Sequence, residues 1–407
     1  MSKLDDLIKQ YCPDGVEYKR IADVCTVITG GEPPADSQKN QDNNHPYAIW
    51  GNGKDVYGYS GSYEVEEDAT VISSIGANTG AVYFREGHFT PIIRLKVVVP
   101  KDNHINARFL YYALSSQKIE SKSSSVPNMN ANEIKRLQIP VPPLTVQEEI
   151  VRILDSFTKL TAELTAELTA RRAQYEYYRD KLLTFDDETA IVKRIRDMLD
   201  QICGGPEKVE YKPLSEIFDF RNGYTPSKSN PEFWENGTIP WFRLEDIREN
   251  GRILDDAIQH VSPEAAKGDL FPADSFIVST SATIGEHAWI TVPFLANQRF
   301  TCLTCKPEWK SKLDLKYVYY ALFNLDKWCK DNIRVGNFAS VDMSGFAKWQ
   351  LPVPPRAVQE EISSILDKFN TLTTDISAGL PAEISLRQKQ HEHYRDRLLN
   401  FNGGGMP

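Results

Sequence analysis

The chain has 407 residues, of which 41% are hydrophobic and 25% charged, so it is long enough for two or three domains of ordinary globular composition. No apolar run is long enough to span a membrane, and the polar start MSKLDDLIKQYCPDG lacks the apolar core of a signal peptide. The six scattered cysteines form no disulfide framework, so we expect a reducing cytoplasm. The net charge of −9 argues against a generic polyanion binder, and any DNA-binding surface has to be local.

An internal duplication organises the whole chain. The segment VEYKRIADVCTVITGGEPP (16–34) is echoed by VEYKPLSEIFDFRNGYTPS (209–227), and YYAL occurs at 111–114 and at 319–322. The segment IPVPPLTVQEEIVRILDSF (139–157) recurs as LPVPPRAVQEEISSILDKF (351–369), and RRAQYEYYRDKLLTF (171–185) recurs as RQKQHEHYRDRLLNF (387–401). Matches in the same order at growing offsets indicate a duplicated unit with insertions and deletions.

Each copy of the unit begins with a globular part. Short alternating runs such as TVISSIGANTGAVYF (70–84) and DSFIVSTSATIGEHAWI (274–290) predict short strands and turns in a mixed α+β domain. We expect the first domain over residues 1–143, with an N-terminal helix. The second is expected over residues 187–355, after a short connecting helix. Pro-Val-Pro-Pro ends each globular part, because proline stops both strands and helices.

A long helix is predicted over residues 144–186. Thr145 is a candidate N-cap, and Glu148 three residues later completes a capping box. A heptad repeat of mostly apolar and aromatic side chains, which we call the seam, predicts a coiled-coil stripe along about 40 residues, or roughly 60 Å. The seam residues are Ile150, Leu154, Phe157, Thr161, Leu164, Leu168, Arg171, Tyr175, Tyr178, Leu182 and Phe185.

The second helical segment covers residues 356–407. It repeats the register through Ile362, Leu366, Phe369 and Ile376, but Gly379 and Pro381 then predict a break. Because one amphipathic helix cannot hide its stripe alone, we expect the two segments to pack against each other. Connectivity then favours two long antiparallel helices that separate the globular domains, related by a pseudo-two-fold axis.

Two different-looking globular domains, each followed by a nearly identical proline-stopped helix, resemble the specificity (S) subunit of type I restriction–modification enzymes. The resemblance covers essentially the whole chain and includes GYTPSKSNPEFWENGTIPWFRLEDI (223–247) and the helix start IPVPPLTVQEEI (139–150). It implies that each globule is a target recognition domain that reads half of a bipartite site in double-stranded DNA. It also implies two methyltransferase (M) subunits and motor-nuclease (R) subunits as partners. S-adenosylmethionine, ATP and Mg are then expected on those partners, and no cofactor on this chain.

The repeat TAELTAEL (161–168) suggests a molecular ruler. One added TAEL lengthens a helix by about 6 Å with a net roll of about 40°, whereas one base pair adds about 3.4 Å and about 35°. The rotations nearly agree, so we hypothesise that the number of copies sets the unread spacer of the site. The alternative is helical filler of arbitrary length.

Side chains that reach base edges or phosphates are candidates for DNA contact, because Arg, Lys, Asn, Gln, Ser and Thr supply the matching donors and acceptors. In the first domain the candidates are Lys54, Tyr57, Ser73, Ser74, Asn78, Thr79, Arg85 and Arg94. In the second they are Arg221, Asn222, Tyr224, Thr225, Lys228, Trp241, Arg243, Ser279, Thr280, Ser281, Thr283, Asn297, Gln298, Arg299, Arg334 and Asn337. Through the resemblance, Gln147, Glu148, Gln359 and Glu360 at the two helix starts are candidates for partner binding.

Metal and catalytic signatures are not expected. Cys302 and Cys305 form a CxxC without a second pair, and their alternation suits a buried strand. His391 and His393 lie two residues apart on a helix, so we expect them to point to different faces and to be solvated. The sequence contains no P-loop, GxGxxG, GxSxG or Asn-Pro-Pro-aromatic motif, which indicates a chain that is not itself an enzyme.

Two alternatives remain open at this point. A coiled-coil adaptor that holds protein partners without reading DNA fits the net charge of −9. A nuclease or methyltransferase is suggested only by the fragment Glu133-Ile134-Lys135, which lacks the preceding Pro-Asp of a nuclease motif.

Overall fold

The computed structural model describes residues 3–119, 129–185, 189–334, 339–374 and 378–401. The chain forms two compact units, Met1–Ala166 with Ala382–Pro407, and Glu167–Pro381. Both long helical segments are divided between the units, so the domain boundaries expected at residues 143 and 355 stay predictions. None of the described helices combines the length and the apolar character that crossing a bilayer requires.

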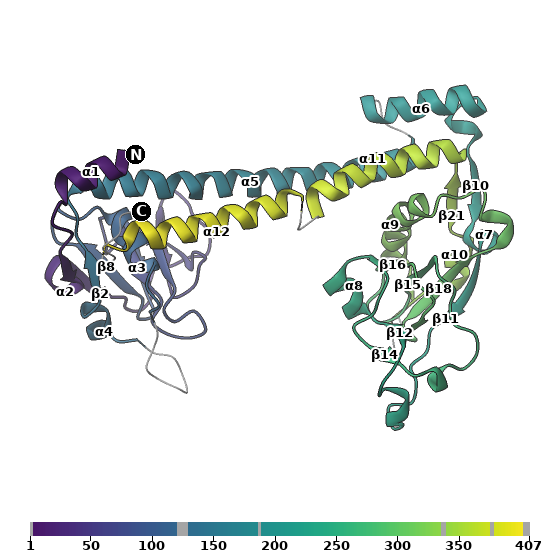
Figure 1. The fold of residues 1–407 in the computed structure, drawn as a ribbon, viewed down its shortest axis with the longest axis horizontal. Helices are drawn as coiled ribbons and strands as arrows, with labels where there is room; N and C mark the ends of the chain where they lie inside the picture. The colour runs from purple at the N-terminus through teal and green to yellow at the C-terminus, as the bar shows by residue number, and fades with distance from the viewer. Residues whose placement is uncertain (1–2, 120–128, 186–188, 335–338, 375–377, 402–407) are drawn as a thin grey trace. The chain divides into compact units, whose positions relative to one another are not determined.

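The first unit contains short strands and helices, as the alternating pattern predicts (Figure 1). Its strands are β1 (Tyr18–Arg20), β2 (Cys25–Thr29), β3 (Tyr47–Trp50), β4 (Gly58–Ser60), β5 (Ala69–Ile72), β6 (Val82–Arg85), β7 (Phe89–Pro91), β8 (Lys96–Pro100) and β9 (Gln138–Pro140). Its helices are α1 (Lys3–Tyr11), α2 (Ile21–Val24), α3 (Ala107–Ser115) and α4 (Ala131–Lys135), with the first part of α5 (Leu144–Thr184) and nearly all of α12 (Leu380–Leu399).

The second unit repeats this plan with additional elements. Its strands are β10 (Glu210–Pro213), β11 (Phe218–Asn222), β12 (Ile239–Phe242), β13 (Ile253–Leu254), β14 (His260–Val261), β15 (Ser275–Ser279), β16 (His287–Ile290), β17 (Leu295–Ala296), β18 (Phe300–Cys305), β19 (Ile333–Arg334), β20 (Ser340–Val341) and β21 (Gln350–Val353). Its helices are α6 (Ala190–Cys203), α7 (Leu214–Ile217), α8 (Leu244–Asn250), α9 (Leu315–Asp331), α10 (Met343–Lys348) and α11 (Arg356–Thr374), with the end of α5. Single 3-10 turns are η1 (Pro206–Lys208), η2 (Pro231–Phe233), η3 (Pro263–Ala265) and η4 (Pro307–Trp309).

The sheets of the two units have the same topology, which confirms the duplication. The central sheet has the order β2-β8-β5-β6 in the first unit and β11-β18-β15-β16, with β13 added at the edge, in the second. A small sheet follows the order β4-β3-β7 and β14-β12-β17, each with one antiparallel and one parallel pair. Two-stranded ribbons β1-β9 and β10-β21 precede the long helices.

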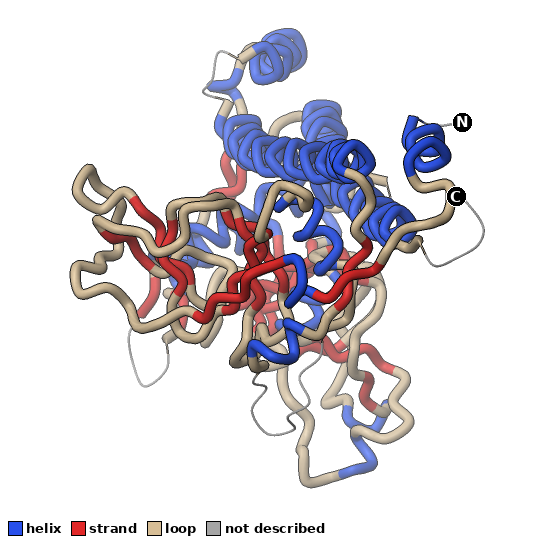
Figure 2. Tube along the Cα trace, turned by 90° about the vertical axis from the view of Figure 1, so that its left-hand side faces the viewer, coloured by secondary structure: helices blue, strands red, loops and turns tan. Residues whose placement is uncertain are grey.

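The long helices pack in antiparallel pairs within each unit, as predicted (Figures 1 and 2). In the first unit Phe157 of α5 stacks on Tyr394 of α12 with ring centroids 5.3 Å apart, while Leu399 joins the core around Ile150. In the second unit Tyr178 of α5 stacks on Phe369 of α11 at 5.5 Å, and Arg172 donates to the carbonyl of Thr373. In each pair, contacts further along one helix are made by residues earlier in the other, so the two helices run in opposite directions.

The seam is buried as the heptad pattern predicts. Ile150, Leu154 and Leu182 are fully buried at the two ends of α5, where globular parts also cover the helix. Between them, the seam residues of TAELTAEL are half-buried and their neighbours are exposed. The seam is therefore more exposed in the middle of α5 than at its two ends.

Of three local predictions for the long helices, one is wrong, one is confirmed and one falls outside the described residues. The helix α5 begins at Leu144, because the amides of Val146 and Gln147 already donate to the carbonyl of Pro143, so Thr145 lies inside the helix and is not its N-cap. The break at Gly379 and Pro381 is confirmed, since α11 ends at Thr374 and α12 starts at Leu380. Ile376 lies outside the described residues.

Candidate nucleic-acid interface

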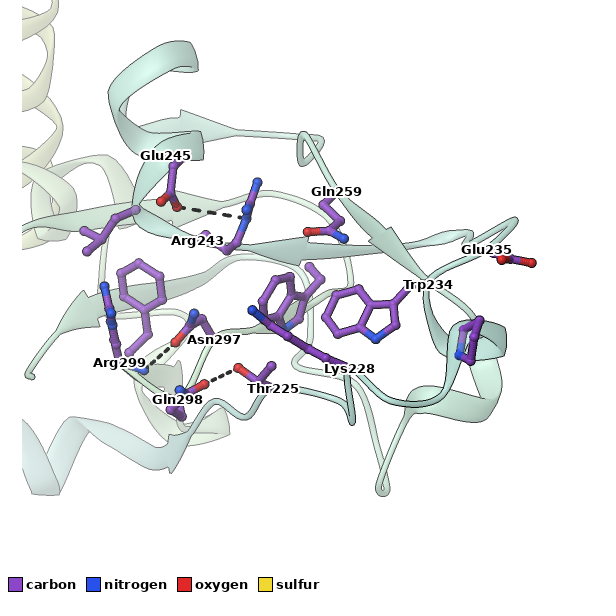
Figure 3. Close-up of a pocket in the computed structure, with 14 residues that line it drawn as sticks. Thr225, Lys228, Trp234, Glu235, Arg243, Glu245, Gln259, Asn297, Gln298 and Arg299 are labelled. Carbon is purple, nitrogen blue, oxygen red and sulfur yellow. Dashed lines mark hydrogen bonds and ion pairs between the residues drawn. The ribbon is translucent and has the colours of Figure 1, made fainter.

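A cleft of about 660 Å³ in the second unit gathers many of the predicted contact residues (Figure 3). One side is formed by the end of β12 and the start of α8, with Arg243, Glu245 and Gln259 (Figure 3). The other side is formed by the loop after β11 and the turn between β17 and β18. From the predicted set, the cleft brings together Thr225, Lys228, Trp241, Arg243, Asn297, Gln298 and Arg299.

Hydrogen bonds hold the polar side of the cleft in place. The hydroxyl of Thr225 donates to the Oε1 of Gln298, which leaves the amide nitrogen of Gln298 available (Figure 3). The Oδ1 of Asn297 accepts from the backbone amide of Arg299 at 2.9 Å. The side chains of Gln298, Arg299 and Lys228 are exposed, so this side offers amide and cationic donors to a ligand.

Aromatic side chains support the cleft from beneath. Trp241 is 3% exposed, and its Nε1 donates to the carbonyl of Tyr224 at 3.0 Å. Trp234 packs edge-to-face on Trp241 at 5.1 Å, and the hydroxyl of Tyr224 donates to the carbonyl of Ala265. Trp241 and Tyr224 therefore shape the cleft, and their polar atoms are already engaged within the domain.

Arg243 has a structural role at the start of α8 and also lines the cleft. Its backbone amide donates to Asp246 at 2.6 Å, which fixes the start of α8, while its Nε lies 4.0 Å from Glu245. The Nε is buried without a hydrogen-bond partner among the described residues. The donors that Arg243 can offer to a ligand are therefore its two terminal nitrogens, which make no hydrogen bond to the described residues, and not the buried Nε.

In the first unit, Asn52 organises the predicted serine loop, although the sequence patterns did not single it out. Its Oδ1 accepts from the amide of Ser74 at 2.7 Å, and its carbonyl accepts from the hydroxyl of Ser73 at 2.7 Å. Ser73 and Ser74 are fully buried, so they position the loop and are removed from the candidate interface. The exposed Asn78 stays in it, and Thr79 bonds the carbonyl of Gly76.

The basic candidates of the first unit divide into engaged and free groups. The guanidinium of Arg85 stacks on Trp50 at 3.7 Å and donates to the carbonyl of Lys54, and burial lowers its pKa. Arg85 therefore stabilises the loop that carries Lys54 and Tyr57, both exposed. Arg94 is also exposed.

The remaining candidates of the second unit divide in the same way. Ser279 and Thr280 are buried, Ser279 accepts from the amide of Glu286, and Thr280 shares a hydrogen bond with Thr301. Because they are buried, Ser279 and Thr280 are removed from the candidate interface, like Ser73 and Ser74 of the first unit. Arg221 stacks on Phe271 at 3.8 Å, Asn222 accepts from Thr301, and Arg334 pairs with Asp342 at 2.5 Å. Ser281 and Thr283 are half-buried, and Asn337 lies outside the described residues.

The two glutamines predicted to face partners are internal anchors. Gln147 is fully buried, donates to the carbonyls of Pro142 and His104, and accepts from the amide of Asn106. Gln359 makes the equivalent three bonds in the second unit. The prediction that these glutamines contact partners is therefore corrected, since only the adjacent Glu148 and Glu360 are exposed.

The cysteines and histidines hold no metal-ligand cluster within the described ranges. Cys302 and Cys305 are buried free thiols in β18, as expected for a buried strand, and burial raises the pKa of Cys305 to about 11. His391 was expected to be solvated, but it lies 5.9 Å from the ring of Tyr112 and 6.4 Å from that of Phe157. This burial lowers the pKa of His391, whereas His393 is exposed.

Seven of the fourteen residues that line the cleft were missed by the sequence patterns, and Gln259 and Glu245 are two polar examples. Gln259 and Glu245 line it, but neither belongs to a Gly-rich or Ser/Thr-rich loop of the kind used to choose candidates. Gln259 lies just before β14, and the pairing of β14 with β12 brings it to the cleft. Only the tertiary pairing of these short strands could have identified it.

Most of the chain is similar to one family of known proteins. Residues 13–171 and 206–386 match the family described as the type I restriction modification DNA specificity domain. The EcoprrI type I restriction enzyme specificity subunit of Escherichia coli is 54% identical over 211 residues, which cover 50% of this chain and 52% of that one. The chain thus spans about half the length of that relative in the alignment.

Other relatives align over more of their length. The EcoR124I/EcoR124II specificity subunit of Escherichia coli is 37% identical over 74% of this chain and 72% of its own. Two solved structures share the fold at low identity. The type I restriction-modification S subunit of M. genitalium has a TM-score of 0.54 at 16% identity, covering 94% of this chain and 96% of its own. A chain from a study of complex assembly and conformational transition of the type I R-M system has a TM-score of 0.60 at 15% identity, covering 95% and 98%.

Proposed function

Because the chain belongs to the family of type I restriction–modification DNA specificity proteins, we propose that it reads double-stranded DNA for such a complex. Each of the two repeated domains reads one half of a bipartite site, and the chain itself catalyses no reaction. The observation that carries the proposal is the cleft in the second unit, which collects amide and cationic side chains on a rigid aromatic base.

The chemistry of the cleft suits base edges and phosphates. Amide groups such as that of Gln298 pair with adenine, and guanidinium groups such as that of Arg243 pair with guanine. The negative net charge is compatible with this role, because only local cations are required where DNA lies. The first domain offers Lys54, Asn78 and Arg94 for the equivalent half of the site.

The helices supply the spacing between the two halves of the site. In this proposal, the two TAEL copies at 161–168 set the length of the unread spacer. Their continuous helical conformation within α5 supports the idea, because only a rigid element converts residue number into distance.

Partner subunits supply the chemistry. We place two methyltransferase subunits near the proline-stopped helix starts, where Glu148 and Glu360 are exposed at equivalent positions. Motor-nuclease subunits join to make the restriction enzyme. S-adenosylmethionine, ATP and Mg are bound by these partners.

Methylation mapping tests the proposal. Cells that contain the methyltransferase partner with this chain should carry methylated adenines at one two-part motif, and cells without the chain should not. Identical methylation in both strains would contradict DNA reading by this chain. It would favour the adaptor alternative, which predicts no duplex binding even with partners present.

A further inference from the structure

Tight turns occur at equivalent places in the two units, and each presents an arginine, although the backbone conformation of the two turns differs. The turn between β7 and β8 carries Arg94, and the turn between β17 and β18 carries Arg299. The strand registers make these two arginines equivalent, since Lys96 pairs with Thr29 in one unit and Thr301 pairs with Asn222 in the other.

Equivalent backbone hydrogen bonds fix the start and end of the two turns. The amide of Ile92 donates to the carbonyl of Trp50 at 2.9 Å, and the amide of Asn297 donates to that of Phe242 at 3.0 Å. At the other end, Gly30 donates to the carbonyl of Leu95 in the first unit, at 2.8 Å. In the second unit, Gly223 donates to the carbonyl of Phe300, at 3.0 Å.

The carbonyl oxygen of each arginine is held as well. In the first unit, the hydroxyl of Ser74 donates to the carbonyl of Arg94 at 2.6 Å. In the second, the amide of Thr280 donates to the carbonyl of Arg299 at 3.0 Å. The buried Ser74 and Thr280 therefore position the arginines. These two residues, predicted from the sequence to contact DNA, support the turn and are not themselves exposed on the surface.

Two glycines allow the neighbouring loop to approach the turn closely. A Cβ on Gly30 would lie 2.6 Å from the carbonyl carbon of Pro91, and a Cβ on Gly223 would lie 2.3 Å from the carbonyl oxygen of Asn297. No backbone contact this short is tolerated, so both positions require glycine. The duplication has thus kept the hydrogen bonds at the start and end of the turn and its close packing. Within the turn the backbone differs, because φ is positive at Ile93 and Arg94 (52° and 59°) but not at Gln298 and Arg299.

The arginine side chains at these turns are free to bind a ligand. Both are exposed, and across the described ranges neither guanidinium has an ion pair, a hydrogen bond or an aromatic ring as a partner. Other arginines of the candidate set are engaged, since Arg85 stacks on Trp50, Arg221 stacks on Phe271 and Arg334 pairs with Asp342. The fold therefore fixes only the backbone of Arg94 and Arg299, and their charged guanidinium groups remain available to a ligand.

The residues just before the arginines differ between the units. Ile93 precedes Arg94 and is 41% exposed, whereas Gln298 precedes Arg299 and is exposed on the cleft. A phosphate backbone is the same in every half-site, but the bases are not. The arginine that the two repeats share at this turn thus suits the phosphate backbone. The residue that differs suits the bases, because the apolar Ile93 fits a thymine methyl group and the amide of Gln298 fits adenine.

From these equivalences, and resting on the proposed function, we infer that Arg94 and Arg299 bind DNA phosphates as a matched pair, while Ile93 and Gln298 determine base preference. The arginines supply affinity to both half-sites without regard to sequence. The residue before each arginine supplies specificity to one half-site only.

Salt-dependent binding of the complex with its methyltransferase partners tests the role of the arginines. Loss of one phosphate contact reduces the slope of log K against log salt by about 0.9, which corresponds to about eightfold weaker binding near 0.1 M salt. We expect this change for Arg94→Ala and for Arg299→Ala, on duplexes with and without the site, and a near-normal slope for Arg94→Lys. Lys310→Ala, an exposed charge beyond the opposite end of β18, is the control and should leave the slope unchanged.

Methylation mapping with the neighbouring residues tests the second part. Ile93→Gln should change one half-site and Gln298→Ile the other, with the arginine variants keeping the wild-type motif. An arginine variant that changes the motif, or that leaves the slope at the wild-type value, would overturn the phosphate assignment. Unchanged motifs in both Ile93→Gln and Gln298→Ile would overturn the specificity assignment. If the wild-type complex shows no sequence preference at all, the proposed function itself fails.

Discussion

Replacing Gln359 by alanine should destabilise the second unit strongly. The side chain is fully buried beside the start of α11, and its Nε2 donates to the carbonyls of Lys312 and Pro354 at 3.0 and 2.8 Å. Its Oε1 accepts from the amide of Asp314, the residue that caps α9, at 2.9 Å. One side chain therefore joins the β21–α11 connection to the start of α9.

The magnitude follows from the three backbone groups that lose their partner. A buried polar group without a hydrogen bond costs about 1–3 kcal/mol, so the free energy of unfolding should fall by about 3 kcal/mol or more. The neighbouring Glu360→Ala removes only an exposed ion pair with Arg356, which contributes about 0–1 kcal/mol. Because Gln359 and Glu360 are neighbours in α11, comparing the two substitutions distinguishes the effect of losing a buried side chain from the effect of changing any residue at the start of the helix.

Urea unfolding of the full chain, followed by tryptophan fluorescence, measures the effect. Six of the seven tryptophans lie in the second unit, and Trp50 alone lies in the first, so the signal reports mainly on the second unit. With a slope near 3 kcal/mol per M, the midpoint should fall by about 1 M in Gln359→Ala. The equivalent Gln147→Ala should leave this transition in place. Equal midpoints for Gln359→Ala and Glu360→Ala would refute the assignment of Gln359 as an anchor.

Hydrogen bonds from Arg152, with one from Lys3, lower the pKa of Glu149 to about 2 against the effect of burial. Because the folded pKa lies below the unfolded one of about 4.3, this carboxylate contributes stability above about pH 5 that is lost as the pH falls toward 2. Glu149→Gln should therefore lower the free energy of unfolding by about 1–2 kcal/mol at pH 6 but hardly change it at pH 2.5. Hydrogen exchange of α1 can measure this effect. A destabilisation of the same size at all pH values would contradict the pairing of Glu149 with Arg152 and Lys3. Gly30→Ala should weaken DNA binding and destabilise the first unit by about 1–3 kcal/mol through overpacking, whereas a Cβ on Gly31 meets no atom within 4 Å, so equal effects of the two substitutions on binding and melting would speak against the close approach. Deletion of residues 165–168 should shorten the spacer of the methylated motif and leave both half-sites unchanged, and mapping that returned the wild-type spacer would remove the ruler hypothesis.

The long helices and the duplication could be predicted because their signals are periodic or repeated. The seam from Ile150 to Leu182 follows a heptad, and burial of an apolar stripe depends on that period alone. The break at Gly379 and Pro381 has an equally local cause, since proline and glycine disfavour helix interiors wherever they occur. The N-cap of α5 was predicted wrongly, because the carbonyl of Pro143 and not the side chain of Thr145 receives the first amides.

The candidate interface was predictable as a set of loops but not residue by residue. Hydroxyl groups such as those of Ser74 and Thr280 suit DNA and partners within the domain equally well, and only the fold decides that Ser74 meets a backbone carbonyl and Thr280 the hydroxyl of Thr301. Gln147 and Gln359 are polar residues at helix starts, where exposure is usual, yet both are buried by the loops before α3 and α9. Gln259 reaches the cleft through strand pairing that no short motif encodes.

Exchange of the second globular domain is the most direct measurement of the account. Residues 205–350 would be replaced by the corresponding segment of another family member, and methylated bases would be mapped across the genome in cells that contain the methyltransferase partner. If the two domains read DNA independently, one half of the motif changes while the other half and the spacer are retained. A motif altered in both halves, or in neither, would contradict independent reading by two domains.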